Sequence, residues 1–209
     1  MWDLTWTVSE DMVMYPGQPA PVFHDFATAA RDGYGMSEYR FWNHLGTHVD
    51  GPLHFFADGR PLDEYPLTRL VTPARVVRGP ERTPIGPAAL EQALGTDFGR
   101  EAVILVTGDW RRWNTPAYFD GYAVLTEDGA AWLVDHHVGL LAVDCPSVDP
   151  VATDVYPIHR ILLGADCLIV ENLAYTPDLP DRVTLAALPI RVKQSNGSPA
   201  RVIAWDRMP

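Results

Sequence analysis

Three of the seven histidines in the chain lie within eleven residues of one another, and an aspartate lies among them: His44, His48, Asp50 and His54. Counted from His44, the other three follow at offsets of four, six and ten residues. Because these offsets are all even, a straight strand would carry the four side chains on one face. Imidazole and carboxylate groups are suitable ligands for zinc, manganese and iron-like divalent ions. The spacing therefore predicts a metal site in this segment.

A straight strand cannot bring the first two histidines to the same ion. Four residues at about 3.3 Å each would keep His44 and His48 roughly 13 Å apart, whereas zinc–nitrogen bonds are about 2.0–2.1 Å long. Gly46 lies between them and tolerates backbone conformations closed to other residues, so we expect the chain to bend there. Gly51-Pro52 predicts a second turn before His54. Three ligands from one loop would leave open coordination positions, which suit catalysis better than a structural role.

Two residues late in the chain are candidates for further ligands. His159 follows Pro157 near the predicted start of a helix, and Glu171 ends the apolar run 168–170. A carboxylate at the end of a buried strand is costly unless it is paired or bound to metal. Each residue also has a structural interpretation, His159 as a satisfied helix-terminal residue and Glu171 as a salt-bridge partner or cap. The pattern alone leaves both interpretations open.

Composition excludes several classes of protein. The 209 residues include 16 basic and 27 acidic side chains, a net charge of −11 without a basic patch, so we expect no nucleic-acid partner. No apolar run approaches the roughly 18–20 residues that span a bilayer, so we expect no membrane association. The first four residues lack the basic side chains of a signal peptide. Cys145 and Cys167 are too few for a disulfide framework, which predicts a reduced, cytoplasmic protein.

The order of the predicted elements indicates a mixed α/β fold. Short apolar, β-branched runs predict buried strands at 103–106, 140–143 and 167–170. Helix start and stop signals predict helices at 87–94, 126–137 and 157–164. Asn196-Gly197 predicts a hairpin turn between strands at 190–193 and 201–205. Strands separated by short helices, with neither a linker nor a repeat, predict a single mixed α/β domain over residues 1–209.

The segment from His44 to His54 closely resembles the signature of the metal-dependent cyclase-like hydrolase family, which includes bacterial kynurenine formamidase and isatin hydrolase. That signature, His-any-Gly-Thr-His-any-Asp-any-Pro-any-His, fixes seven of eleven positions, and all seven are present here. Further segments that resemble the family are Asp3-Leu4-Thr5, Tyr15-Pro16-Gly17, Thr107-Gly108, residues 144–150, Pro157-Ile158-His159 and Glu171-Asn172-Leu173. The resemblance implies a compact domain with the swivelling β/β/α arrangement of the cyclase-like fold.

The resemblance also implies a site with two divalent ions per chain, with zinc preferred and manganese the alternative. The residues it assigns as metal ligands are His44, His48, Asp50, His159 and Glu171. In this assignment Asp50 bridges, Glu171 contacts both ions, and the first ion is otherwise held by the two early histidines. His54 would be the general acid and base rather than a ligand. Tyr15 would line the substrate pocket.

The activity implied by the resemblance is hydrolysis of an amide C–N bond by metal-bound hydroxide, most directly by an arylformamidase of the N-formylkynurenine type. Alternatives on the same metals are hydrolysis of a cyclic amide or imide such as isatin, or a cyclase or hydrolase step of secondary metabolism. A non-enzymatic metal-binding protein is a third class, but His54 argues against it, because a structural site needs no spare histidine. Family members are usually dimers or tetramers, so we expect a homodimer or homotetramer. An N-terminal segment can reach a neighbouring subunit's site in this family.

One predicted loop gathers four aromatic residues: Trp110, Trp113, Tyr118 and Phe119. We favour a role in the core or a subunit interface, and the alternative is an aromatic wall for a flat aromatic amide or lactam substrate. Cys145 is interpreted as a small buried filler, because nothing identifiable would lower its pKa. Tyr15 stands where formamidases commonly have tryptophan, so the exact substrate stays open.

Overall fold

The computed structural model describes residues 1–79, 81–95, 100–122 and 125–206. The strands of its main sheet are β1 (Trp2–Asp3), β4 (His48–Asp50), β5 (Val71–Arg78), β6 (Ala102–Val106), β7 (Leu140–Val143), β8 (Leu168–Glu171), β9 (Arg182–Pro189) and β10 (Gly197–Trp205). The α-helices are α1 (Ala29–Asp32), α2 (Leu67–Leu70), α3 (Pro87–Leu94), α4 (Glu127–Asp135) and α5 (Pro157–Gly164). Short 3₁₀ turns are η1 (Pro52–His54), η2 (Leu62–Glu64), η3 (Asp109–Arg112) and η4 (Pro116–Phe119).

The main sheet closes on itself like a barrel. Its strand order is β1-β10-β4-β8-β7-β6-β5-β9, and β9 at one end also pairs with β10 near the other. Strands β5 to β8 run parallel to one another, whereas all other pairings in the sheet, including β5 with β9 and β8 with β4, are antiparallel. Closure pairs strand edges that would otherwise be open to other chains.

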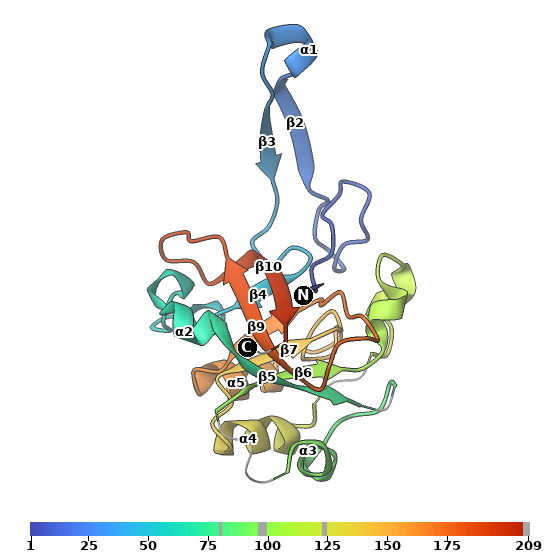
Figure 1. Cartoon of the computed structure of the whole chain (residues 1–209), viewed down its shortest axis with the longest axis vertical. Helices are drawn as coiled ribbons and strands as arrows, with labels where there is room; N and C mark the ends of the chain where they lie inside the picture. Colours follow the sequence, from blue (N-terminus) through green and yellow to red (C-terminus); the bar gives the residue numbers. More distant parts are fainter. Residues whose placement is uncertain (80, 96–99, 123–124, 207–209) are drawn as a thin grey trace.

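Side chains along the central strands alternate between two apolar layers, as the pleat of a sheet requires. Along β6, Ile104 packs in the core enclosed by the sheet, and Leu105 packs in a second core on the outer face. Helices α3, α4 and α5 cover that outer face with Leu90, Leu133 and Leu162 (Figure 1). This arrangement, in which strands and helices share one continuous body, agrees with the predicted mixed α/β class.

The predicted helices and central strands are confirmed with small shifts. α3 and α5 occupy the predicted residues, and α4 begins after Thr126, whose side chain accepts a hydrogen bond from the Gly129 amide at 3.0 Å. β6, β7 and β8 lie within one residue of their predicted bounds.

The predicted C-terminal hairpin is wrong in its turn and in its first strand, because residues 190–193 are not part of a strand. β9 and β10 do pair antiparallel, but β9 ends at Pro189 and residues 190–196 form a loop. Pro199 has no amide hydrogen to donate to the loop, and residues 197–199 of β10 pair with β4 rather than with residues 190–196. Gly197 instead begins β10, where it is paired with Asp50 of β4. Asn196 and Gly197 therefore lie beside the histidine segment and do not form a two-residue turn.

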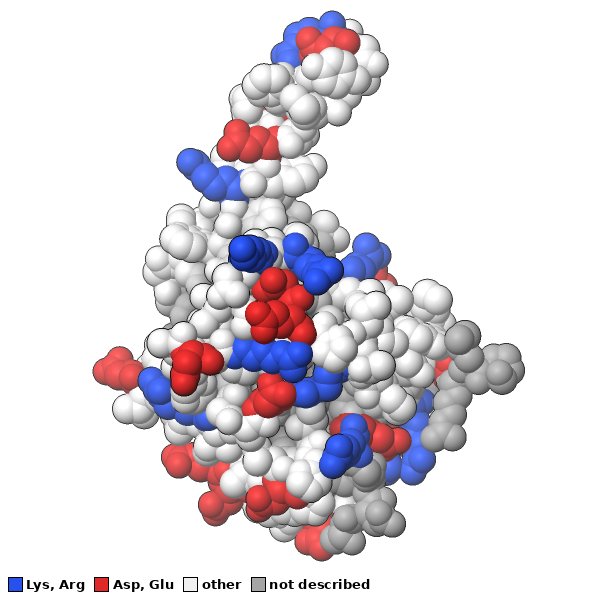
Figure 2. Space-filling view, turned by 90° about the vertical axis from the view of Figure 1, so that its left-hand side faces the viewer, with Lys and Arg blue, Asp and Glu red and all other residues white. Residues whose placement is uncertain are grey.

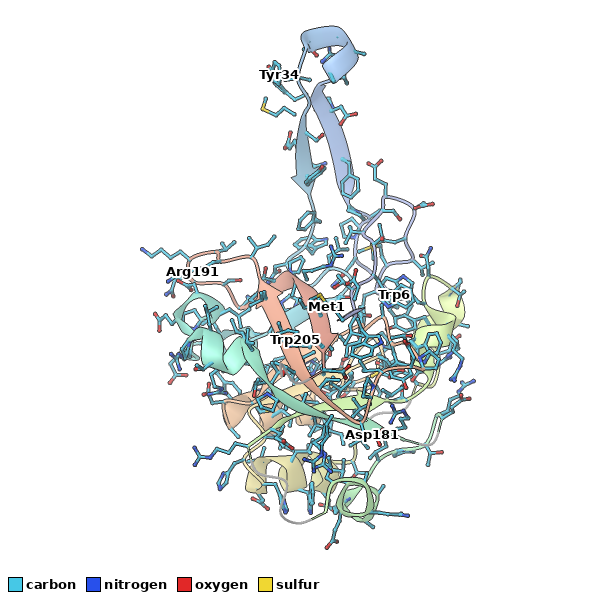
Figure 3. All side chains as sticks on the ribbon, viewed as in Figure 1. Met1, Trp6, Tyr34, Asp181, Arg191 and Trp205 are labelled. Atoms are coloured by element: carbon cyan, nitrogen blue, oxygen red, sulfur yellow. The ribbon has the colours of Figure 1, made fainter. Side chains whose placement is uncertain are left out.

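An arm projects from the body of the molecule. Strands β2 (Val22–Ala27) and β3 (Met36–Arg40) pair antiparallel, with α1 between them, and the pair stands away from the closed sheet (Figure 1). Every residue of β3 is exposed. Tyr34 lies near the tip of this arm (Figure 3). The sequence patterns had not predicted this element.

Charges of both signs are mixed over the face drawn in Figure 2, which shows no extended basic area there. Among the described residues, no helix is long and apolar enough to cross a membrane.

Candidate metal centre

The histidine segment bends where the glycine was expected to permit it. Gly46 has a positive φ of 56°, and after it the chain enters β4 at His48. The Gly46 carbonyl accepts a hydrogen bond from Nδ1 of His48 at 2.8 Å. Because that bond uses Nδ1 as the donor, the neutral ring of His48 has its lone pair on Nε2. The bend also brings the rings of His44 and His48 to a centroid separation of 5.2 Å.

The first cluster of metal-binding groups comes from this segment alone. Nδ1 of His44 lies 2.6 Å from Oδ1 of Asp50, and Nε2 of His48 lies 3.2 Å from the same oxygen. The three side chains place one ligand atom each within 4.8 Å of one another. His48 and Asp50 are buried, and His44 is partly so. These three residues form the first ligand group.

The second ligand group consists of Asp50, His159 and Glu171. Nε2 of His159, at the start of α5, lies 3.4 Å from Oε1 of Glu171 and 3.7 Å from Oδ2 of Asp50. Glu171 reaches the site because β8 pairs with β4, where its register partner is His48. The two groups share Asp50, so the structure brings together all five residues expected to be ligands.

Whether these groups suit a metal can be tested on the oxygen atoms of Asp50. Oδ2 of Asp50 is buried and, among the described residues, has no hydrogen-bond partner. Leaving a buried carboxylate oxygen unpaired is costly, so such an atom calls for a cation. Imidazole nitrogens and carboxylate oxygens surround it, which is a donor set for zinc or manganese. The residues present therefore fit a divalent ion.

The charges of the cluster depend on one another. Burial alone would raise the pKa of Asp50, but the adjacent His48 and His44 hold it well below its usual range. Burial opposes protonation of His48, yet Asp50 and Glu171 raise the pKa of His48 to about 9. Asp50 therefore stays ionised, and at the nitrogen of His48 a metal ion would have to displace a proton.

His54 lies beside both ligand groups without belonging to either. It ends η1, and its ring stacks on that of His44 at a centroid distance of 4.0 Å, with His159 6.0 Å away. Burial lowers the pKa of His54 to about 4. The neighbouring imidazoles lower this pKa further, whereas Asp50 raises it. The ring is neutral at pH 7 and can accept a proton.

A cavity of about 370 Å³ opens onto the cluster. Tyr15 lines it and contacts Phe119 edge-to-face at a centroid distance of 5.7 Å. Trp113 lines it as well, with its other side stacked on Trp6 at 5.1 Å. A volume of this size and an aromatic lining suit a small flat ligand.

The aromatic loop therefore divides between the two interpretations. Trp113 and Phe119 line the cavity. Tyr118 is buried, with its hydroxyl 3.0 Å from both the Asp144 carbonyl and the Asn172 side chain, and Trp110 packs against the enclosed core. Trp110 and Tyr118 therefore fit the favoured structural role, whereas the positions of Trp113 and Phe119 are compatible with the aromatic wall, which stays a prediction.

Cys145 fits its expected role as a filler. Its side chain is buried, and its thiol lies 3.1 Å from the Ser147 carbonyl. Burial and the nearby Asp144 and Glu171 carboxylates raise the pKa of the Cys145 thiol. A thiol held protonated in this way is a poor nucleophile.

Sequence reasoning missed the residues that support the ligands. Asp149 accepts a hydrogen bond from Nδ1 of His159 at 2.7 Å, and Oδ1 of Asn196 lies 3.3 Å from Nε2 of His44. The only signal for Asp149 was its place in residues 144–150, one of the segments that resemble the family. Asn196 was missed because Asn196-Gly197 was interpreted as a hairpin turn.

Comparison with known proteins agrees with this geometry. Residues 2–150 match the family described as "Putative cyclase". The chain belongs to this family. It is 30% identical over 207 residues to the kynurenine formamidase of Salinibacter ruber (strain DSM 13855 / M31), a match that covers 98% of this chain and 96% of that protein. The kynurenine formamidase of Bordetella petrii is 28% identical over 211 residues, covering 97% and 96% of the two chains.

A solved structure shares this fold. Isatin hydrolase A from Labrenzia aggregata, bound to benzyl benzoate, superposes with a TM-score of 0.86 at 23% identity, covering 99% of this chain and 93% of that one. The expected cyclase-like architecture is therefore confirmed.

Proposed function

We propose that this member of the putative cyclase family is a metal-dependent hydrolase that cleaves the amide C–N bond of an aryl formamide of the N-formylkynurenine type. The observation that carries the proposal is the pair of ligand groups sharing Asp50 beside an aromatic-lined cavity. The full-length relatives at 28–30% identity, both kynurenine formamidases, support the substrate class.

In this proposal each ligand group holds one divalent ion. His44, His48 and Asp50 hold the first, and Asp50, His159 and Glu171 hold the second. Zinc is the preferred metal and manganese the alternative, because both accept imidazole and carboxylate ligands. When bound, such an ion lowers the pKa of a water molecule towards neutrality and polarises a carbonyl group.

His54 acts as the general acid and base. Its neutral ring accepts the proton of the attacking water at a ring nitrogen and donates it to the leaving nitrogen of the amide. The carbonyl carbon gains a C–O bond and loses its C–N bond, so the products are formate and an aryl amine. Tyr15, Trp113 and Phe119 hold the aromatic ring of the substrate against the cavity wall.

A second candidate is hydrolysis of a cyclic amide of the isatin type. The specific observation that favours it is the fold shared with isatin hydrolase A over nearly the whole chain. A bicyclic lactam is also flat and small enough for an aromatic-lined cavity of about 370 Å³. Both reactions would use the same ligands and His54, so they differ only in the fit of the substrate.

We further propose that the protein is a homodimer or homotetramer assembled through the β2–β3 arm. The arm exposes Phe26 and Tyr39, each at 63%, and Tyr34 at 56%. Large apolar side chains so exposed on one projecting element are typical of a surface that another protein covers. The two buried free cysteines support a reducing, cytoplasmic location.

The experiment for the proposed activity uses the full chain reconstituted with Zn²⁺ and, separately, with Mn²⁺. N-formylkynurenine and isatin are supplied side by side, and release of formate and opening of the lactam are followed. We expect kcat/KM for formate release from N-formylkynurenine to exceed kcat/KM for opening of isatin by at least about tenfold. The reverse order would replace the first candidate by the second. Failure to hydrolyse either compound with metal bound would contradict both.

A further inference from the structure

We propose that Asp149 is a positioning residue that orients His159 and fixes which ring nitrogen it offers to a metal. The inference rests on the proposed ligand role of His159. Asp149 is 1% exposed, and its carboxylate accepts three hydrogen bonds, all from the first residues of α5. The bonds come from the Ile158 amide at 2.9 Å, the His159 amide at 3.0 Å and Nδ1 of His159 at 2.7 Å.

The bond to the ring decides the tautomer of His159. A carboxylate only accepts hydrogen bonds, so Nδ1 must carry the proton. In the neutral ring the lone pair is then on Nε2, the atom that faces Glu171 at 3.4 Å and Asp50 at 3.7 Å. A carboxylate on the far side of a metal-binding imidazole also increases the basicity of the ligating nitrogen.

The two amide bonds fix the position of the ring as well as its tautomer. Tyr156 precedes α5 with a positive φ of 47°, and no side chain at that position caps the helix. Asp149 supplies the missing acceptors for two of the free amides at the helix start. One carboxylate therefore holds both the backbone of His159 and its ring, so neither moves without breaking a bond to Asp149.

Asp149 is itself held in place by neighbours outside the ligand groups. Its carbonyl accepts a hydrogen bond from the Tyr122 hydroxyl at 2.5 Å, and its amide donates to Oγ of Ser147 at 3.2 Å. His48, by contrast, is oriented by a backbone carbonyl of its own loop. The ring of His159 is oriented by a side chain instead, and a substitution can remove that side chain.

The test is a double-mutant cycle measured by Zn²⁺ affinity, with a chelating indicator as competitor and the full chain stripped of metal. The variants are Asp149→Ala, His159→Ala and the two combined. We expect Asp149→Ala to weaken Zn²⁺ binding by about 10–100-fold, the usual effect of removing a partner of a ligand. In the His159→Ala background the same change should have less than a twofold effect, because a positioning residue acts only through its target.

The matched control is Asp144→Asn. Asp144 lies five residues earlier, is fully buried, and accepts hydrogen bonds from the Thr107 and Gly108 amides without contacting an imidazole. The Zn²⁺ affinity of the Asp144→Asn variant should stay within twofold of that of the unmodified chain, even if the substitution lowers the melting temperature. If Asp149→Ala does not fold, Asp149→Asn replaces it in the same cycle, with an expected loss of about tenfold.

The inference is overturned if Asp149→Ala folds and binds Zn²⁺ as the unmodified chain does, since Asp149 would then only cap the helix. Equal losses with and without His159 would overturn it too. If His159→Ala leaves Zn²⁺ affinity unchanged, the ligand assignment fails and the inference with it. None of these readouts depends on amide hydrolysis, so failure of the proposed activity would be seen separately.

Discussion

At the scale of single residues, the account depends most on Asp50. It is the only residue that belongs to both ligand groups of the described chain, and one of its oxygens has no hydrogen-bond partner there. The other residues of the site reach Asp50 from three directions: the bend at Gly46, the start of α5 and the end of β8. A carboxylate in this position holds the two groups together.

Asp50→Asn should therefore impair metal binding more than any loss of a supporting residue. Removing a partner of a ligand costs about 10–100-fold in affinity, so we expect a loss of more than about 100-fold for this shared ligand. Zn²⁺ titration of the stripped protein measures it, with the exposed Asp135→Asn as control. Zn²⁺ affinity within tenfold of the unmodified protein would contradict the shared role of Asp50.

The two cysteines yield a prediction about reactivity. Both thiols are buried, and burial raises the pKa of Cys167 to about 12 and that of Cys145 as well. Because only the thiolate reacts readily, neither should react with a thiol reagent at pH 8 in the native protein. Both should react after denaturation. Rapid labelling of one thiol in the folded chain would show that Cys145 or Cys167 is more accessible than described.

At the scale of elements, local signals predicted α3, α4 and α5 but neither α1 nor α2. Pro157 and Gly164 mark the two ends of α5, and Thr126 begins α4 as an N-cap residue does. These elements are set by short-range chemistry, so their bounds could be predicted from neighbouring residues. The turn at Asn196-Gly197 could not, because prolines in the strands and pairing with β4 decided it.

Thr126→Ala should destabilise α4 without affecting the site. Its side chain accepts the Gly129 amide, and losing such a cap costs about 1 kcal/mol, equivalent to about 2–4 °C in melting temperature for a chain of this size. Thr115→Ala is the comparison, because the Thr115 hydroxyl precedes η4 but donates an exposed hydrogen bond to the Arg112 carbonyl instead of capping the helix. Equal melting temperatures for the two variants would refute the capping role, as measured by thermal unfolding of the metal-bound protein.

At the scale of the whole molecule, the closed sheet joins residues distant in sequence. β4 lies between β8 and β10, so the histidine segment meets Glu171 on one side and Gly197 on the other. Spacing revealed the first ligand group, because its members share one loop. Sequence resemblance was needed for His159 and Glu171, since each alone also had a structural interpretation. The arm was missed because every residue of β3 is exposed, so the strand has no apolar alternation. Asp149 was missed because a hydrogen bond between side chains ten residues apart leaves no spacing pattern.

The arm yields a prediction about assembly. If the exposed aromatic residues pack against another copy of the chain, charges placed there should break the contact. Phe26→Asp combined with Tyr39→Asp should shift the mass measured by light scattering from a dimer or tetramer to a monomer. The melting temperature should change little if the body folds independently of the arm. A monomeric unmodified protein, or an assembly that the double variant leaves intact, would contradict this role.

The central claim is that His54 performs acid–base catalysis beside a metal centre that it does not help to bind. The most direct test is kcat/KM for N-formylkynurenine in His54→Ala, together with the Zn²⁺ content of the same sample and the exposed His137→Asn as control. The account predicts unchanged Zn²⁺ content and a fall of about 100-fold or more, the usual scale for loss of an acid–base group. Full activity in His54→Ala, or loss of Zn²⁺ in parallel with activity, would contradict it.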